Sequence, residues 1–121
     1  DEDFVAELWE SMLSFGTGLV QGFGSDPSPI LGHLDYFLDL SMHTTSALAN
    51  DEDVLKAAIT LLGDMANVMR NGPPQYRGAA KGKLCTPQVQ QLVGSAMQWD
   101  DEALQESAKW SMRELQHLSN C

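Results

Sequence analysis

Apolar residues recur at intervals of three and four along the chain, while strict alternation is absent and β-branched residues are sparse. This periodicity is typical of amphipathic α-helices and predicts an all-α protein of about five helices. The first helix is expected over residues 2–22, before a turn rich in glycine and proline. Its expected buried stripe consists of Val5, Leu8, Met12, Phe15, Leu19 and Phe23.

A capping signal separates the second and third helices. The second helix is expected over residues 30–49, with a stripe formed by Ile30, Leu34, Phe37, Ser41, Thr45 and Leu48. Asn50 followed by Asp53 resembles a capping box in which Asp replaces Glu, so the third helix is expected to begin there. The turn over residues 71–74 (NGPP) ends it. The third stripe consists of Val54, Ala58, Leu61, Leu62, Met65, Val68 and Met69.

A basic stretch over residues 70–83 follows the third helix and contains no acid. Because it is rich in glycine and alanine, we expect a long connecting loop with room for a short helical turn. Thr86 followed by Pro87 is a cap with proline at the first helical position, which opens a fourth helix through Val89, Leu92, Val93 and Ala96. A fifth helix is expected after Asp100, with a stripe formed by Leu104, Ala108, Met112, Leu115 and Leu118.

Five helices joined by short turns form either a closed bundle or a stack of helical hairpins. The first, third and fifth helices begin roughly 50 residues apart, near the ~40–47 residue period of armadillo and HEAT units. This spacing favours an α-α superhelix, a HEAT-repeat solenoid with about two and a half antiparallel pairs in one domain. Residues 1–23 are expected to supply the inner helix of a first repeat, 30–70 a second repeat and 71–121 the final repeat.

The charge of the chain restricts its expected partners. Its 121 residues include 17 acidic and 7 basic ones, which gives a net charge of −10 at pH 7. Such an acidic surface repels phosphate backbones, so basic partners are favoured and nucleic acid is not expected. No apolar run approaches the ~18 residues that a membrane span needs, so no membrane partner is expected either.

The cysteine content and the first residue bear on the cellular context. Two cysteines, Cys85 and Cys121, are too few for a disulfide scaffold, so a reducing compartment such as cytosol or nucleus is expected. The chain opens with Asp1 rather than Met, and we interpret it as a piece of a longer protein.

No pattern typical of an enzyme or a cofactor site occurs in the sequence. The glycines of residues 16–22 lack the G-x-G-x-x-G spacing and follow no strand, so we interpret them as sites of close helix packing. The three histidines, His33, His43 and His117, lack metal-ligand spacing, and no His or basic residue is arranged by the sequence to activate Cys85. We therefore expect neither catalysis nor a bound cofactor or metal.

Trp110 is the most informative polar-face residue of the fifth helix. At 100° per residue it lies at about 240° from Leu104, off the buried stripe and on the face that carries Glu106 and Glu114. An indole beside carboxylates suits an Arg or Lys side chain, which stacks on the ring while its charge meets an acid. The alternative is that Trp110 lies under a neighbouring helix, and the exposure of its side chain distinguishes the two.

Acidic side chains also mark the polar faces of the first and third helices. Asp64 is expected at about 280° from Val54, pointing away from the core. Glu7, Glu10 and Gln21 share the polar face of the first helix. If these faces line one side of a solenoid, they form an acidic groove for a basic segment; the alternative is that they are ordinary solvated faces.

Three motifs occur at distant points of the chain: AELWES and TGLVQG within residues 6–22, LLGD at 61–64, and AKW with REL over 108–115. In this order they resemble the last HEAT repeats of the importin-beta family of nuclear transport receptors. The resemblance extends over nearly the whole chain. It departs from the family pattern at Trp9, where a polar residue is common, and in the Gly-, Pro- and Lys-rich connection over 72–83.

The resemblance implies a superhelix with the first, third and fifth helices on its concave side. In the family this side wraps the basic importin-beta-binding helix of the adaptor importin-alpha, so importin-alpha or a basic cargo is the expected partner. Trp110 and Asp64 match inner-face residues of the family. The complete set of expected partner-binding residues is Trp110, Asp64, Glu106, Glu114, Glu10, Glu7 and Gln21.

The resemblance further implies a protein that shuttles between cytoplasm and nucleus, whose contacts with Ran-GTP and nucleoporins lie outside this chain. The alternative function is a structural HEAT or armadillo scaffold with no ligand site of its own. Self-association through apolar surface at the N-terminal side of the stack is also expected, because an open solenoid end lacks a polar cap.

Overall fold

The computed structural model describes residues 2–22, 32–47 and 50–121, and within these ranges it contains six α-helices and no strand. The prediction of an all-α fold is confirmed, with one helix more than expected. The helices are α1 (Glu2–Gly22), α3 (Leu34–Ala47), α4 (Glu52–Asn71), α5 (Pro74–Leu84), α6 (Pro87–Ala96) and α7 (Glu102–Ser119).

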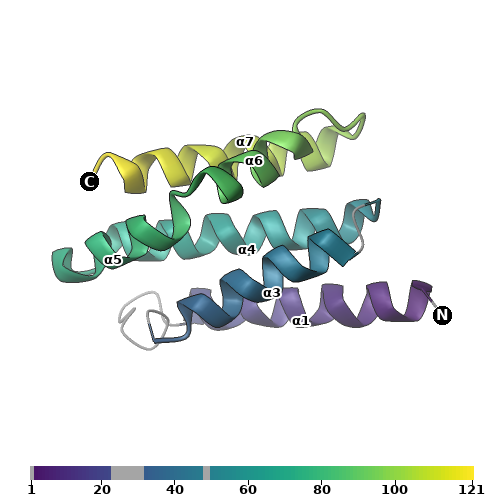
Figure 1. The fold of residues 1–121 in the computed structure, drawn as a ribbon, viewed down its shortest axis with the longest axis horizontal. Helices are drawn as coiled ribbons and strands as arrows, with labels where there is room; N and C mark the ends of the chain where they lie inside the picture. The colour runs from purple at the N-terminus through teal and green to yellow at the C-terminus, as the bar shows by residue number, and fades with distance from the viewer. Residues whose placement is uncertain (1, 23–31, 48–49) are drawn as a thin grey trace.

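The helices form two layers (Figure 1). In one layer α1, α4 and α7 lie side by side and run in the same direction. In the other layer α3, α5 and α6 run in the opposite direction and cover the first layer. This stacking of antiparallel helices is compatible with the expected α-α repeat. The first, third and fifth expected helices correspond to α1, α4 and α7, so they share one layer.

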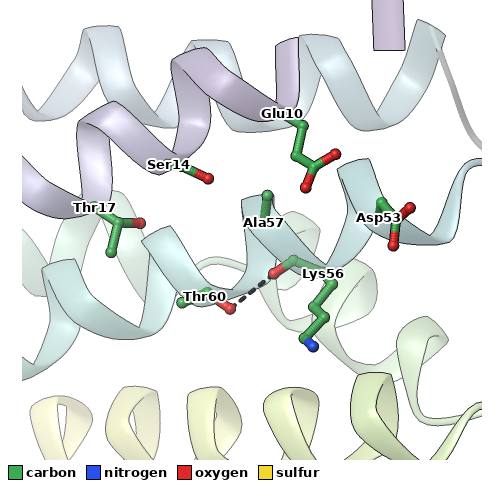
Figure 2. A pocket seen from close by; sticks show the side chains of 7 residues that line it. All are labelled: Glu10, Ser14, Thr17, Asp53, Lys56, Ala57 and Thr60. Carbon is green, nitrogen blue, oxygen red and sulfur yellow. Dashed lines mark hydrogen bonds between the residues drawn. The ribbon is translucent and has the colours of Figure 1, made fainter. Parts of the chain in front are cut away.

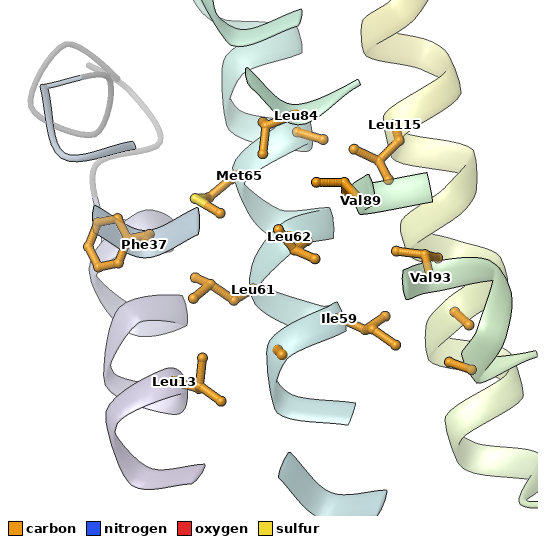
Figure 3. Packing of buried hydrophobic residues seen from close by; sticks show 14 of the residues in the cluster. Leu13, Phe37, Ile59, Leu61, Leu62, Met65, Leu84, Val89, Val93 and Leu115 are labelled. Carbon is orange, nitrogen blue, oxygen red and sulfur yellow. The ribbon is translucent and has the colours of Figure 1, made fainter. Parts of the chain in front are cut away.

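The core is centred on α4, which contacts every other helix. All members of its expected stripe are buried, which confirms that prediction. Figure 3 shows Leu61 and Met65 of α4 meeting Leu13 of α1 and Phe37 of α3, while Ile59 points toward α7. Because α4 has neighbours on both sides of its layer, its burial extends well beyond one stripe to Leu55, Ile59, Gly63, Asp64 and Ala66.

Side-chain caps fix the helix starts close to where the sequence predicts them. Thr86 caps α6 by accepting a hydrogen bond from Val89 N at 3.3 Å, as expected. Asp101 caps α7 through Leu104 N at 2.8 Å. At the start of α4 the cap is Asp51 rather than Asn50, because the Asp51 carboxylate accepts from the next amides.

The expected buried stripe of α1 is wrong. Leu8, Met12 and Phe15 are exposed, with 48%, 37% and 69% of their surface accessible. Ala6 and Leu13 are buried instead, together with Gly16, whose missing side chain lets Leu61 and Phe37 approach. The physical reason is that α1 lies at the end of its layer and has a neighbour in that layer on one side only. Of the other expected members of this stripe, Val5 is half-buried. Leu19 and Phe23 lie outside the described side chains.

The remaining stripes are confirmed where the structure describes them. In α3 the buried positions include Leu34, Phe37, Ser41 and Thr45, while Ile30 and Leu48 lie outside the described residues. In α6 and α7 every expected position is buried except Leu92 and Met112, which are half-buried.

The basic loop expected over residues 70–83 is largely a helix, α5. Pro74 occupies its first position, where a missing amide hydrogen costs nothing, and Ala80 and Leu84 pack one turn apart into the core. Lys83 Nζ bonds both carboxylate oxygens of Asp35 on α3, at 2.6 and 2.7 Å. With only Ala80 and Leu84 fully buried, α5 has too weak an apolar periodicity to be recognised from the sequence.

Candidate inner-face binding surface

The layer of α1, α4 and α7 exposes a polar surface on the side away from α3, α5 and α6, which we call the inner face. Between α1 and α4 this face is hollowed into a groove of about 290 Å³, lined by Glu10, Ser14, Thr17, Asp53, Lys56, Ala57 and Thr60. Figure 2 shows the Glu10 carboxylate projecting from α1 toward the first turns of α4, where Asp53 and Lys56 lie. Side chains of both charge signs therefore line the groove, with acids in excess.

Asp64 lies between α1 and α7 on α4 and is only 9% exposed. The prediction that it points away from the core is wrong, because α1 and α7 close over the side of α4 on which it sits. Gln21 Nε2 of α1 donates a hydrogen bond to Asp64 Oδ2 at 3.4 Å. Burial raises the pKa of Asp64 to about 6; the Gln21 hydrogen bond opposes this shift and the nearby Glu114 carboxylate adds to it.

Glu114 of α7 is also buried and joins α7 to α4. Its Oε2 accepts hydrogen bonds from Arg70 Nη2 at 3.1 Å and from Asn67 Nδ2 at 3.3 Å. Only 9% of the Glu114 side chain is accessible, against 30% for Arg70. A partly buried, hydrogen-bonded ion pair of this kind holds the two helices in register, and removing either partner leaves a buried charge.

Trp110 of α7 is half-buried and lies against Gly63 of α4. A Cβ atom placed on Gly63 would stand 2.5 Å from Trp110 Cζ3, so glycine is required for this close approach. Next to it, the Ser111 hydroxyl donates to the Ile59 carbonyl at 2.8 Å. One edge of the indole thus packs against α4, as the structural alternative expects, and the Trp110 side chain as a whole is partly accessible.

The other expected binding residues lie farther toward solvent. Glu7 is exposed on α1, and Glu10 is half-buried at the groove. Glu106 is exposed one turn before Trp110 and lies 3.7 Å from Lys109 Nζ. The structure therefore brings Gln21 to Asp64 and places Glu106 beside Trp110, while Glu7 stands apart from both.

Three further inner-face residues lie outside the expected set of partner-binding residues. Lys56 lines the groove, and Arg70 and Asn67 bind Glu114. Arg70 belongs to the basic stretch by sequence, yet it is the last-turn residue of α4 and points to α7. Its spacing of three residues from Asn67 places both on one side of α4, which is the signal that could have identified them.

Within the described part of the chain, no group of three or more His, Cys, Asp or Glu side chains is arranged to hold a metal ion. No described helix is both long enough and apolar enough to span a membrane. What the inner face offers chemically is carboxylates, hydroxyls and an accessible indole edge, a combination suited to binding cationic side chains. Comparison with family models, curated proteins and solved structures gives no match for this chain.

Proposed function

We propose that the inner face binds a basic helical segment, and that the chain is the C-terminal HEAT-repeat portion of a nuclear transport receptor of the importin-beta kind. One observation carries this proposal. Helices α1, α4 and α7 share one layer although they are far apart in sequence (Figure 1), and they carry the acids Glu10, Asp53 and Glu106 and the half-buried indole of Trp110. The partner would be the basic importin-beta-binding helix of importin-alpha or a basic cargo.

The residues of the inner face divide into contacting and supporting ones. Glu10 and Glu106 are accessible and can meet Lys or Arg side chains directly, and Trp110 can stack on a guanidinium. Asp64 and Glu114 are buried and already bonded to Gln21 and Arg70, so they support the surface instead. In this proposal the groove between α1 and α4 accepts one long basic side chain.

In this proposal the protein acts in nuclear import and shuttles between cytoplasm and nucleus. Binding of Ran-GTP and nucleoporins would belong to repeats other than these. A structural scaffold module is the second candidate, and the packing of Trp110 on Gly63 is the observation that favours it. The two candidates differ in whether the accessible part of the inner face has a ligand.

Calorimetric titration with a synthetic basic helix tests the proposal. We expect saturable binding at about 20 mM ionic strength that weakens at about 150 mM, because exposed charge pairs are screened by salt. Glu10→Lys should weaken binding about two- to tenfold, since each exposed pair contributes up to about 1 kcal/mol. Trp110→Leu should also weaken it, because the leucine keeps apolar contact with α4 but offers no ring to a cation.

Asp39→Lys is the matched control for the charge reversal. Asp39 is an exposed acid on α3, in the layer that does not contribute to the inner face. This control should bind the basic helix within about twofold of the unaltered chain. Absence of binding at low salt, or equal weakening by Asp39→Lys and Glu10→Lys, would reject a specific inner-face site and favour the scaffold.

A further inference from the structure

The large apolar side chains that the structure shows as exposed all lie on α1 and α3. They are Leu8, Met12 and Phe15 of α1 and Tyr36 of α3, with between 37% and 69% of their surface accessible. We call these four residues the α1–α3 edge. They adjoin an apolar groove of about 430 Å³, lined by Ser11, Met12, Phe15, His33, Tyr36, Phe37 and Leu40. The groove is large enough to receive an aromatic side chain from a partner.

The α1–α3 edge is the continuation of an interface that the fold already uses. In the layer of α1, α4 and α7, the middle helix is covered on both sides, by α1 and by α7. Helix α1 is covered by α4 on the side of Leu13, and Phe15 and Leu8 lie at about 200° and 220° from Leu13 around the helix axis. These side chains therefore point to the place where another helix of the layer would lie.

The opposite end of the stack has a different surface. Every Leu, Met and Trp of α6 and α7 is at least half-buried. Apart from Ala103, the exposed side chains along α7 are polar or charged, among them Lys109, Arg113 and Gln116. Head-to-tail stacking would press the apolar α1–α3 edge against these charges, at a cost in desolvation. An apolar surface matching the α1–α3 edge is found only on the same edge of another copy, among the described residues.

We propose that a second copy of this chain docks on the α1–α3 edge through its own α1–α3 edge, in a two-fold symmetric dimer. In such an interface Phe15 of one copy enters the apolar groove of the other, and the reverse contact is made by symmetry. The accessible parts of the four side chains amount to roughly 400 Å² per copy, about half the share of a standard stable interface. An interface of this size is typical of weak, transient contacts, so we expect the dimer to be reversible.

The charge of the chain gives this dimer a characteristic salt dependence. Each copy carries a net charge of −10, so two copies repel one another and added salt screens the repulsion. The dimer should therefore strengthen as salt is raised, whereas binding of a basic helix to the inner face should weaken. The proposal uses none of the proposed binding residues of the inner face, and the opposite salt effects distinguish failure of one proposal from failure of the other.

Sedimentation equilibrium over a range of concentrations tests the proposal. We expect a monomer–dimer equilibrium whose dissociation constant falls when the ionic strength is raised from about 50 to 500 mM. Phe15→Ser and Leu8→Gln should each raise the dissociation constant about tenfold; both side chains are largely exposed, so the fold is preserved. Gln116→Ser, at the opposite end of the stack, is the control and should leave the constant unchanged.

A second variant tests the two-fold symmetry. In a background with Cys85→Ser and Cys121→Ser, Phe15→Cys should yield a disulfide-linked dimer under mild oxidation, because the two positions face one another across the axis. A monomer at every concentration and salt would overturn the proposal. Association that resists Phe15→Ser and Leu8→Gln, or that continues beyond the dimer as head-to-tail contacts do, would overturn it as well.

Discussion

Asp64 gives the free energy of unfolding a pH dependence opposite to that of an exposed, salt-bridged acid. Burial raises its pKa from 3.8 to about 6 in the folded chain, and unfolding returns it to the lower value. The folded state therefore binds the proton more tightly, so stability is gained as the pH falls from about 7 to 4. The gain is about 1.4 kcal/mol between pH 7.5 and pH 5, and it approaches about 3 kcal/mol once both states are protonated.

Asp64→Asn removes the ionisable group and keeps an oxygen for the hydrogen bond from Gln21 Nε2. We expect this variant to be more stable than the unaltered chain at pH 7.5, by up to about 3 kcal/mol, because the cost of burying a charge is gone. Between pH 7.5 and pH 5 its stability should gain about 1.4 kcal/mol less than that of the unaltered chain. Urea denaturation followed by far-UV circular dichroism at the two pH values measures both quantities.

Glu106→Gln is the matched control, because it removes an exposed carboxylate from the same face. It should leave the difference in stability between pH 7.5 and pH 5 as it is in the unaltered chain. If Asp64→Asn and the unaltered chain have parallel pH profiles, the carboxyl is not desolvated and the reasoning from its burial is wrong.

Gly63→Ala should destabilise the protein by about 1–3 kcal/mol, because the added methyl group meets Trp110 Cζ3 at 2.5 Å; urea denaturation measures the loss. Gly82→Ala is its control, since nothing lies within 4 Å of a Cβ at that exposed helical position, and it should be neutral or stabilising by up to about 1 kcal/mol. Asp101→Ala should cost about 1 kcal/mol by removing the cap on Leu104 N, seen as a lower urea midpoint with an unchanged slope. A loss below about 0.3 kcal/mol for Asp101→Ala would show that the cap contributes little in this protein.

The helices that the sequence predicts best are those whose surroundings are simplest to infer. The stripe of α4 was predicted in full, because a central helix buries every apolar position whichever neighbour covers it. The starts of α4, α6 and α7 follow from local capping, in which the side chains of Asp51, Thr86 and Asp101 accept hydrogen bonds from amides two or three residues later. Such interactions join residues that are close in sequence, so they can be predicted without knowledge of the fold.

Helix α1 could not be oriented from its own sequence because it has two apolar sides. One contains Ala6, Leu13 and Gly16, and the other contains Leu8 and Phe15. Size and hydrophobicity favour the second side, yet α4 packs against the first, where small residues permit close approach. Which of the two apolar sides of α1 is buried depends on how the neighbouring helices pack against it. That is a property of the tertiary structure.

The exposure of the candidate site residues could not be predicted from the sequence. The first, third and fifth expected helices do share one layer, as α1, α4 and α7 (Figure 1), yet Asp64 and Glu114 are buried. The burial of Asp64 and Glu114 depends on partners 43 and 44 residues away, Gln21 and Arg70. A helical wheel places a side chain at an angle, and only the distance between helices decides whether solvent reaches it.

The parallel course of α1, α4 and α7 also polarises the molecule along its helix axes. The amino ends of α4 and α7 gather at one side and carry acids, close enough that Asp101 raises the pKa of Glu52. At the carboxyl ends lie Arg70 and α5, with Lys81 bonded to the carbonyl of Cys121. The side chains thus form an electric dipole that opposes the summed backbone dipoles of the three helices. Its field draws the cationic end of an approaching molecule toward the amino ends, so orientation is set before any contact is made.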